Sequence, residues 1–249
     1  MRELDIIDLL GSYSLFDVEL LQHSMFISPI LYAGKKGSKY SKARATSPDK
    51  LAVSLTQVQK DVLVGTILGD ASIERNKPTH NTRIRFEQTF PAHAYYLTTL
   101  YIHFLNLTGK CPTVQSRKAD KRTGDIYSTI SFKTLMFPCL NIFHAIFYKD
   151  GTKIVPLNIG ELLSARALAY WIMDDGGKGS HGETILHTRS FTLKEVQLLQ
   201  SVLMDNFGLR TRLSEKVPGQ WVIIIPVKQV RPVKDIVAPY MCLSMLYKL

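Results

Sequence analysis

The sequence predicts a mixed α/β fold (α+β), built as a tandem, pseudo-symmetric duplication of one αββαββα unit. Two apolar segments, LVGTILGDA (63–71) and LAYWIMDDG (168–176), align without gaps and carry an aspartate at the same position near the end. Each is followed, in the same order, by a strand-like segment, an amphipathic helix, a hairpin and another apolar segment. This repetition predicts two units with antiparallel sheets, packed against each other through their first helices.

The first unit is expected to span residues 51–158, after an N-terminal extension and basic linker at 1–50. Its second element, RIRFEQTF, alternates polar and apolar residues as a half-buried strand does. In chain order the expected elements are a helix capped by Thr56, a strand at 83–90, a helix at about 91–106 that ends by Gly109, a hairpin around Arg122–Gly124, and an apolar helix followed by Lys153.

The second unit is expected to span residues 159–249 and to repeat this order. Glycines after its first helix would allow the positive φ that ends a helix. The expected elements are a helix capped by Ser164, a strand at 184–191, a helix at about 192–206 that ends at Gly208, a hairpin around Val217–Gly219, and a closing helix with Lys248.

The chain of 249 residues carries a formal net charge of +10. The charge is uneven, because residues 1–33 are net −4, residues 34–50 net +5 and residues 51–249 net +9. A basic folded body favours a polyanionic partner, most often nucleic acid. For the Lys-rich and Ser-rich segment 34–50, a solvated tether and a phosphate-binding arm are both open.

Several classes of protein are disfavoured. Cys111, Cys139 and Cys242 are far apart without a CxxC pair, which argues against a disulfide framework and a structural zinc site. The longest uncharged apolar run, 134–148, is shorter than the roughly 18 to 20 residues of a membrane span. The first thirty residues carry five acids and no clear cleavage pattern, so they resemble neither a secretory signal nor a transit peptide. With no run long enough to span a bilayer, no membrane partner is expected.

Two helices packed side by side would bring Asp70 and Asp175 together. Gly65 and Gly69 lie four residues apart on one helix face, where small residues allow a second helix to approach closely. Neighbouring carboxylates repel, which favours a divalent cation between or beside them, and without a matching His or Cys set Mg²⁺ or Mn²⁺ is expected. Such a metal in a basic protein suits hydrolysis of phosphodiester bonds. For either acid alone, a solvated helix end is the alternative.

LVGTILGDA and LAYWIMDDG resemble the two motifs of single-chain LAGLIDADG homing endonucleases. The resemblance covers about residues 55–249 and includes the segments QTF (88–90) and RSF (189–191). AYWIMDDGG, with GTKIVP before it and LYKL at the end, is especially similar to the fungal mitochondrial intron-encoded branch. The resemblance implies a saddle of two antiparallel sheets on DNA, with the paired acids at its centre over the minor groove.

The same resemblance implies the metal ligands. Asp70 and Asp175 would be the catalytic acids that bind the metal ions, one mainly serving each DNA strand. Gly69 and Asp174, which precede them, would offer backbone carbonyls. Mg²⁺ would be the cofactor, Mn²⁺ would substitute, and Ca²⁺ would bind without supporting turnover.

Further site residues are also implied by resemblance. Lys153 and Lys248 match basic active-site residues that activate water or stabilise developing charge, although each taken alone could be a solvated lysine. Gln88 matches a catalytic polar residue that positions water, and Arg189 stands at this position in the second unit. Tyr170 stands where the first helix has a glycine, so the helix crossing is expected to be asymmetric.

Alternation along the strands places basic residues on a solvent-facing side. Arg83 and Arg85 alternate with Ile84 and Phe86, and polar sheet faces of this kind can lie in the major groove and read base edges. For any single arginine, an ordinary exposed strand position is the alternative. The residues expected to bind DNA are Arg83, Arg85, Arg117, Lys118, Lys133, Arg189, Arg210, Arg212 and Lys216.

Together these features predict a monomeric, metal-dependent endonuclease that cuts both strands of a long asymmetric DNA target and leaves staggered ends. The resemblance places it in an organelle, most often the mitochondrion. An RNA maturase that helps its host intron to splice, alone or in addition, is the alternative, and a DNA-binding regulator is a third possibility. Neither would need both acids, so the intact Asp70 and Asp175 favour the enzyme.

Overall fold

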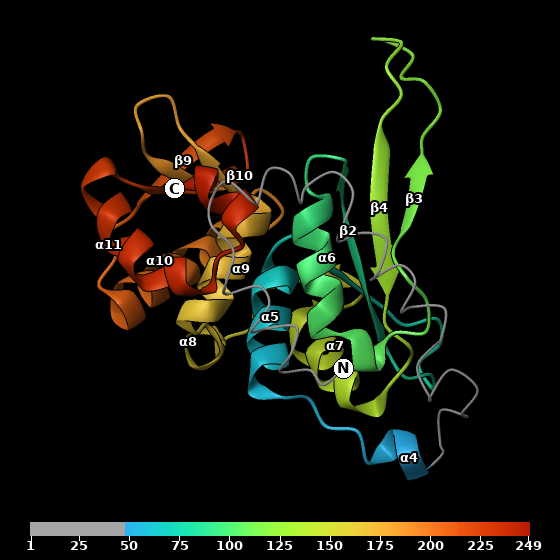
Figure 1. Cartoon of the computed structure of the whole chain (residues 1–249). Helices are drawn as coiled ribbons and strands as arrows, with labels where there is room; N and C mark the ends of the chain where they lie inside the picture. Colours follow the sequence, from blue (N-terminus) through green and yellow to red (C-terminus); the bar gives the residue numbers. More distant parts are fainter. Residues whose placement is uncertain (1–47) are drawn as a thin grey trace.

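The computed structural model describes residues 48–249, so residues 1–47 of the expected extension and linker at 1–50 lie outside the described residues. The chain folds as two similar halves, which confirms the predicted duplicated α/β fold (Figure 1). The first half contains α4 (Pro48–Leu51), α5 (Gln57–Leu68), β1 (Ser72–Glu74), β2 (Arg83–Phe90), α6 (Ala94–His103), η1 (Leu105–Leu107), β3 (Thr113–Ser116), β4 (Ser128–Lys133), η2 (Pro138–Leu140), α7 (Asn141–Phe147), β5 (Tyr148–Lys149) and β6 (Thr152–Lys153).

The second half repeats this series after a short helix, and it closes on 3-10 turns in place of a strand pair. Its first long helix, α9, runs directly into the strand β7. It contains α8 (Ile159–Leu162), α9 (Ala165–Asp175), β7 (Gly176–Lys178), β8 (Thr184–Leu186), α10 (Leu193–Phe207), β9 (Arg212–Val217), β10 (Gln220–Ile225), α11 (Val227–Val237), η3 (Ala238–Tyr240) and η4 (Leu243–Lys248).

Each half holds one four-stranded antiparallel sheet, in the orders β1-β2-β4-β3 and β7-β8-β10-β9. Along β2 and β4 every second residue is buried, as the alternation in the sequence predicts. Phe86 and Phe132 stack on this inner face, with ring centroids 4.7 Å apart, and Phe104 next to α6 packs on Phe86. The opposite face of the sheet is left for the polar side chains.

The helix starts agree with the sequence. Thr56 and Gln59 form a capping box at the start of α5, and the Ser164 hydroxyl accepts a hydrogen bond from the Ala167 N–H at the start of α9. Both caps were predicted and are confirmed. A second capping box, formed by Thr192 and Glu195, begins α10.

The glycine at the end of α9 has a different role from the predicted one, whereas Gly69 at the end of α5 has the close-packing role that the sequence predicts. Gly69 and Gly176 both have negative φ, −92° and −73°, so neither ends its helix in the left-handed conformation. A side chain on Gly69 would overlap the Cβ of Asp174, and one on Gly176 would overlap the carbonyl of Ile172. Close approach, and not positive φ, requires glycine at these two positions.

Helices α5 and α9 pack against each other between the two halves of the molecule (Figure 1). Gly65 faces the backbone of Ala167 and the Cβ of Tyr170, so equivalent positions of the two motifs meet across the interface. The Tyr170 hydroxyl lies 2.8 Å from His103 Nε2, which satisfies this buried group on the side of the first half. The expected asymmetric crossing therefore pairs a glycine with a tyrosine.

Three predicted boundaries were wrong. Helix α6 ends at His103 and continues as a 3-10 turn, so Gly109 does not end it; Gly109 instead faces Leu135 closely. The strand expected at 184–191 stops at Leu186, and 189–190 lie in a turn. Residues 48–50 of the expected linker belong to α4, where Lys50 is buried with its ammonium 5.5 Å from the Phe137 ring. At Gly109 and Lys50 a tertiary contact replaces the local signal.

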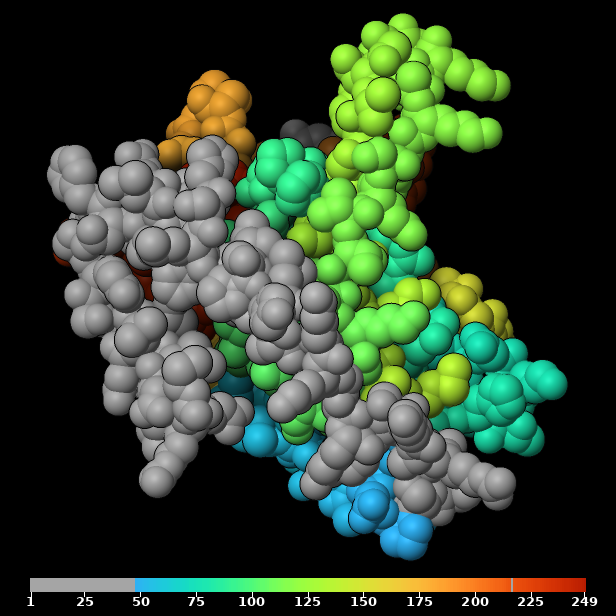
Figure 2. All heavy atoms as spheres, turned by 45° about the vertical axis from the view of Figure 1, so that its right-hand side comes forward, coloured from blue at the N-terminus to red at the C-terminus, as the bar shows by residue number. Residues whose placement is uncertain are grey.

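The hairpins of the two halves differ in length. Between β3 and β4 the chain continues as an arm, residues 117–127, in which the Arg117 N–H donates to the Tyr127 carbonyl at 2.8 Å. Figures 1 and 2 show this arm projecting from the body. Strands β9 and β10 are joined by a short turn, in which Val217 already pairs with Gln220. The described part of the chain has no helix long and apolar enough to span a membrane.

Candidate active site

The carboxylates of the two motifs meet where α5 and α9 end. Asp70 follows α5 and is exposed, while Asp174 and Asp175 are the last two residues of α9 and are partly buried. Burial, followed by the charge of Asp70, raises the pKa of Asp175 from 3.8 to about 7, with Lys153 and Lys248 acting in the opposite direction. The structure therefore brings together one acid from each half of the chain.

A lysine from each half lies beside these acids. Lys153 in β6 donates hydrogen bonds to the Gly69 and Ala71 carbonyls, each at 2.9 Å. Lys248 at the end of η4 donates to the Asp174 carbonyl at 2.8 Å and also to that of Met173. Both lysines thus bind the end of the motif helix in their own half.

The two ammonium groups are poorly solvated. Burial lowers the pKa of both lysines, while the nearby aspartates act in the opposite direction. Their position places two positive charges against the backbone at the point where the carboxylates converge. The two predicted lysines are therefore at the site, and their catalytic role stays a prediction.

Gln88, near the end of β2, joins the two motifs. Its Nε2 donates to Asp70 Oδ2 at 2.9 Å and to Asp174 Oδ1 at 3.2 Å. The Asp174 carboxylate also accepts from the Tyr96 hydroxyl at 2.8 Å and from the Asp70 N–H at 3.2 Å. Burial, followed by the charge of Asp70, raises the pKa of Asp174 well above its ordinary value.

The side chain of Asp174 is more involved than the sequence suggested. Comparison of the motifs favours its backbone carbonyl alone, because the first motif has a glycine at this position. In the structure its carboxylate fills the space that Gly69 leaves and binds the backbone of Asp70. The doubled aspartate in the sequence was the available signal; for its partner Tyr96, 78 residues earlier, there was none.

The two halves of the site are not equivalent. In the first sheet Ser72 pairs with Arg85, and in the second Gly176 pairs with Leu186. When residues are counted from Asp70 and from Asp175 through these strand pairs, Gln88 and Thr188 come at the same position in the two sheets. Arg189 comes one residue later and is not the counterpart of Gln88. The buried Thr188 hydroxyl donates to the Trp221 carbonyl at 2.8 Å.

Arg189 is therefore not the counterpart that the aligned segments predict. It lies exposed in the turn after β8. The alignment of the segments QTF and RSF missed this difference because β8 is shorter than β2.

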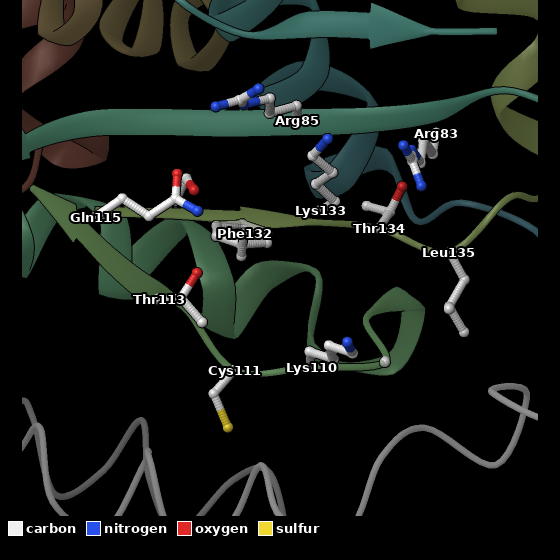
Figure 3. Close-up of a pocket in the computed structure, with 12 residues that line it drawn as sticks. Arg83, Arg85, Lys110, Cys111, Thr113, Gln115, Phe132, Lys133, Thr134 and Leu135 are labelled. Carbon is white, nitrogen blue, oxygen red and sulfur yellow. The ribbon is translucent and has the colours of Figure 1, made fainter. Parts of the chain in front are cut away.

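The basic face of the first sheet carries acidic partners that the sequence analysis missed. Arg83 and Lys133 both pair with Glu74, at 2.7 and 2.8 Å, and Arg85 pairs with Glu87. Arg83, Arg85 and Lys133 line one open pocket of about 410 Å³ on the sheet (Figure 3). The pairs hold the cations in place and reduce the net charge of this face.

The other predicted DNA contacts are spread over both halves. Arg117 and Lys118 are exposed on the projecting arm, and Arg117 lies 3.5 Å from Glu87 Oε1. Arg210 and Arg212 are also exposed, Arg210 just before β9 and Arg212 at its first position. The side chain of Lys216 lies outside the described part of the chain.

Comparison with known proteins agrees with this geometry. The model of the LAGLIDADG DNA endonuclease family matches residues 60–232. The chain belongs to the LAGLIDADG DNA endonuclease family. A solved structure, the homing endonuclease I-WcaI bound to its DNA recognition sequence, is similar with a TM-score of 0.74 and 27% identity, over 84% of this chain and 95% of that one.

Curated relatives of this LAGLIDADG chain carry two kinds of name. Cytochrome b mRNA maturase bI2 of Debaryomyces hansenii is 35% identical, over 76% of this chain and 72% of the relative. The protein of that name from Saccharomyces cerevisiae is 30% identical, and this chain covers 46% of its length. Intron-encoded endonuclease ai4 of Dictyostelium discoideum is 37% identical, over 59% of this chain and 96% of the relative.

The donor atoms of the LAGLIDADG motifs fit a hard divalent cation. Asp70 and Asp175 supply carboxylate oxygens, and the Gly69 and Asp174 carbonyls keep a lone pair beyond the one that binds lysine. Within residues 48–249 no group of three or more His, Cys, Asp or Glu side chains is arranged to hold a metal ion by itself. These donor atoms therefore suit a cation whose remaining coordination positions are filled by oxygen atoms of phosphate and water.

Replacing Asp175 by asparagine is expected to stabilise the protein at high pH. An acid whose pKa is higher in the folded chain than in the unfolded chain binds protons more tightly when folded, so the folded state loses stability as the pH rises from 3.8 to about 7. Asp175→Asn removes this loss. Its free energy of unfolding should exceed that of the wild type by on the order of 2 kcal/mol at pH 8, and the difference should vanish near pH 4.

Urea unfolding in EDTA across this pH range measures the effect. Asp205→Asn, on the exposed side of α10, is the matched control and should follow the wild-type curve. A constant difference between Asp175→Asn and wild type at all pH values would contradict the assignment.

Proposed function

We propose that this chain is a site-specific endonuclease that cuts both strands of a long, asymmetric DNA target and requires a divalent cation, Mg²⁺ in the cell. The observation that carries the proposal is the meeting of Asp70 and Asp175, one from each half, at the ends of two packed helices between two antiparallel sheets. One acid and one lysine from each half match a reaction that occurs twice, once on each strand.

The acids, the lysines and Gln88 of the site would have different roles in the reaction. Asp70 and Asp175, with the Gly69 and Asp174 carbonyls, would hold the cation, which when bound polarises the phosphodiester and lowers the pKa of its water. Lys153 and Lys248 lie where negative charge develops on the phosphate, and their burial strengthens this electrostatic stabilisation. Gln88 holds the Asp70 carboxylate and can orient the attacking water.

DNA binding would depend on basic residues of the two sheets and of the arm. Arg83, Arg85 and Lys133 lie on one face of the first sheet, and sheets of this kind can enter the major groove. The exposed Arg117 and Lys118 would contact phosphates from the arm. Because the two halves of the chain differ, the target is asymmetric and one monomer covers it.

Cleavage of a randomised duplex DNA library tests the function. The full chain is incubated with the library in Mg²⁺, and the new ends are sequenced. We expect double-strand cuts with staggered ends at one recurring sequence. If protein that unfolds cooperatively cleaves no member of the library, the proposed function is wrong.

Calcium is expected to support binding of the recovered target but not its cleavage. Ca²⁺ accepts six to eight ligands in loose geometry, whereas Mg²⁺ imposes a near-octahedral arrangement on the reacting groups. Fluorescence anisotropy in Ca²⁺ and single-turnover cleavage in Mg²⁺, Mn²⁺ and Ca²⁺ measure the two steps. Efficient cleavage in Ca²⁺ would contradict the proposed role of the cation.

Intron RNA maturation is a second candidate function. It is supported by two relatives, 35% and 30% identical, that are named cytochrome b mRNA maturases. Those names also support an organellar, mitochondrial location for this chain. A splicing assay with RNA of the intron that contains the reading frame tests the maturase, and splicing should persist in the Asp70→Asn, Asp175→Asn double variant.

A further inference from the structure

A histidine that the sequence analysis did not predict as a site residue forms a hydrogen bond with Gln88 of the site. His93, directly before α6, places Nδ1 3.0 Å from Gln88 Oε1 and Nε2 3.1 Å from the Tyr247 hydroxyl. Its backbone N–H donates to the Thr89 carbonyl at 2.9 Å, which ties the residue to the end of β2. Tyr247 belongs to η4 of the second half and precedes Lys248. A chain of hydrogen bonds therefore runs from the second half through His93 to Gln88 and Asp70.

The chemistry of these groups determines which way each one points. The Gln88 amide must turn its NH₂ towards Asp70 and Asp174, because its carbonyl oxygen would repel the carboxylates. Its Oε1 therefore faces His93, which must donate from Nδ1. In the neutral ring Nε2 is then an acceptor, and the Tyr247 hydroxyl donates to it.

We propose that His93 is a positioning residue that fixes the orientation of the Gln88 amide and, through it, the Asp70 carboxylate, and that Tyr247 holds His93 from the other half of the chain. The second half has no equivalent arrangement among the described residues, because Thr188 stands at the position of Gln88 and donates to a backbone carbonyl. Loss of His93 should therefore affect the first half of the site. The kinetic consequences of this proposal rest on the proposed endonuclease function.

Two replacements of His93 separate hydrogen bonding from packing. Asparagine can place its Nδ2 near the position of the imidazole Nδ1 and keep a donor to Gln88, whereas leucine fills space without a donor. On the target recovered from the library, His93→Leu should slow single-turnover cleavage of one strand by about 10- to 100-fold, the range typical of residues that orient a metal ligand. His93→Asn should stay within about threefold of wild type, and neither variant should change DNA binding in Ca²⁺.

The affected strand should be the one that the single variant Asp70→Asn slows more. Equal rates for His93→Leu and wild type would overturn the proposal, as would equal losses in the asparagine and leucine variants. His80→Leu is the matched control, because this histidine is exposed in the segment between β1 and β2, and it should leave both strands unaffected.

A second measurement does not depend on DNA cleavage. The side-chain amide protons of Gln88, assigned by their absence in Gln88→Glu, are followed by ¹⁵N NMR in the full-length protein. We expect a resolved pair in wild type and His93→Asn, and a shifted or averaged pair in His93→Leu. An unchanged pair in His93→Leu would overturn the inference, whereas failure of wild type to cleave DNA would count against the proposed function alone.

Discussion

The double replacement Asp70→Asn, Asp175→Asn is expected to abolish cleavage and to leave DNA binding intact. Asparagine keeps the size of each side chain but removes the charge that a divalent cation requires. The single-turnover rate should fall at least about 1,000-fold, as when a group that stabilises developing charge is removed. Binding rests on basic residues of the sheets and should be unchanged or tighter, because two negative charges next to DNA are lost.

The matched control is Asp205→Asn, Asp235→Asn, which changes two exposed aspartates on the outer helices α10 and α11. It alters the net charge by the same amount and should cleave as the wild type does. Retained activity in the Asp70 and Asp175 double variant would refute the active-site assignment, even if the endonuclease function holds.

Replacing Gly65 by alanine is expected to destabilise the protein more than any other single methyl group added at a glycine of the helices. The new Cβ would overlap the Ala167 carbonyl oxygen and lie 2.8 Å from the Tyr170 Cβ, so α5 and α9 must move apart. We expect a loss of about 3 kcal/mol in the free energy of unfolding, even after the gain of about 1 kcal/mol in helix propensity. Urea unfolding monitored by circular dichroism measures the change.

Gly160→Ala in α8 is the matched control. The nearest atom to its new Cβ would be Val202 Cγ2 at 3.5 Å, an ordinary contact, so stability should change by less than about 1 kcal/mol. Similar losses for the two alanine variants would show that the close approach of the helices at Gly65 is not required.

Much of the architecture could be predicted from the sequence because it depends on local sequence patterns that occur in both halves of the chain. The caps at Thr56 and Ser164, the alternation of β2 and the small residues of α5 each follow from short-range chemistry. Repetition then turned two weak signals into one strong one. An aspartate at the end of one apolar helix says little, but two at equivalent positions predict a shared site.

The contacts within the site were less predictable because they join residues far apart in the chain. Tyr96 and Asp174 are 78 residues apart, and His93 and Tyr247 are 154 apart, with no spacing that relates them. Strand register shows that Thr188 and not Arg189 corresponds to Gln88, since β8 is shorter than β2. Glu74 and Glu87 pair with the basic residues of the sheet only once the strands lie side by side.

The sequence by itself determined the duplicated fold, the family and the acids and lysines that converge on the site, because motif and repeat are local properties of the chain. Only the tertiary structure decided how these groups are held. Hydrogen-bond geometry depends on positions set to within a fraction of an ångström by packing between the two halves, and periodicity in a sequence carries no such distances. The space left by Gly69 and filled by the Asp174 carboxylate is a property of the packed pair of helices.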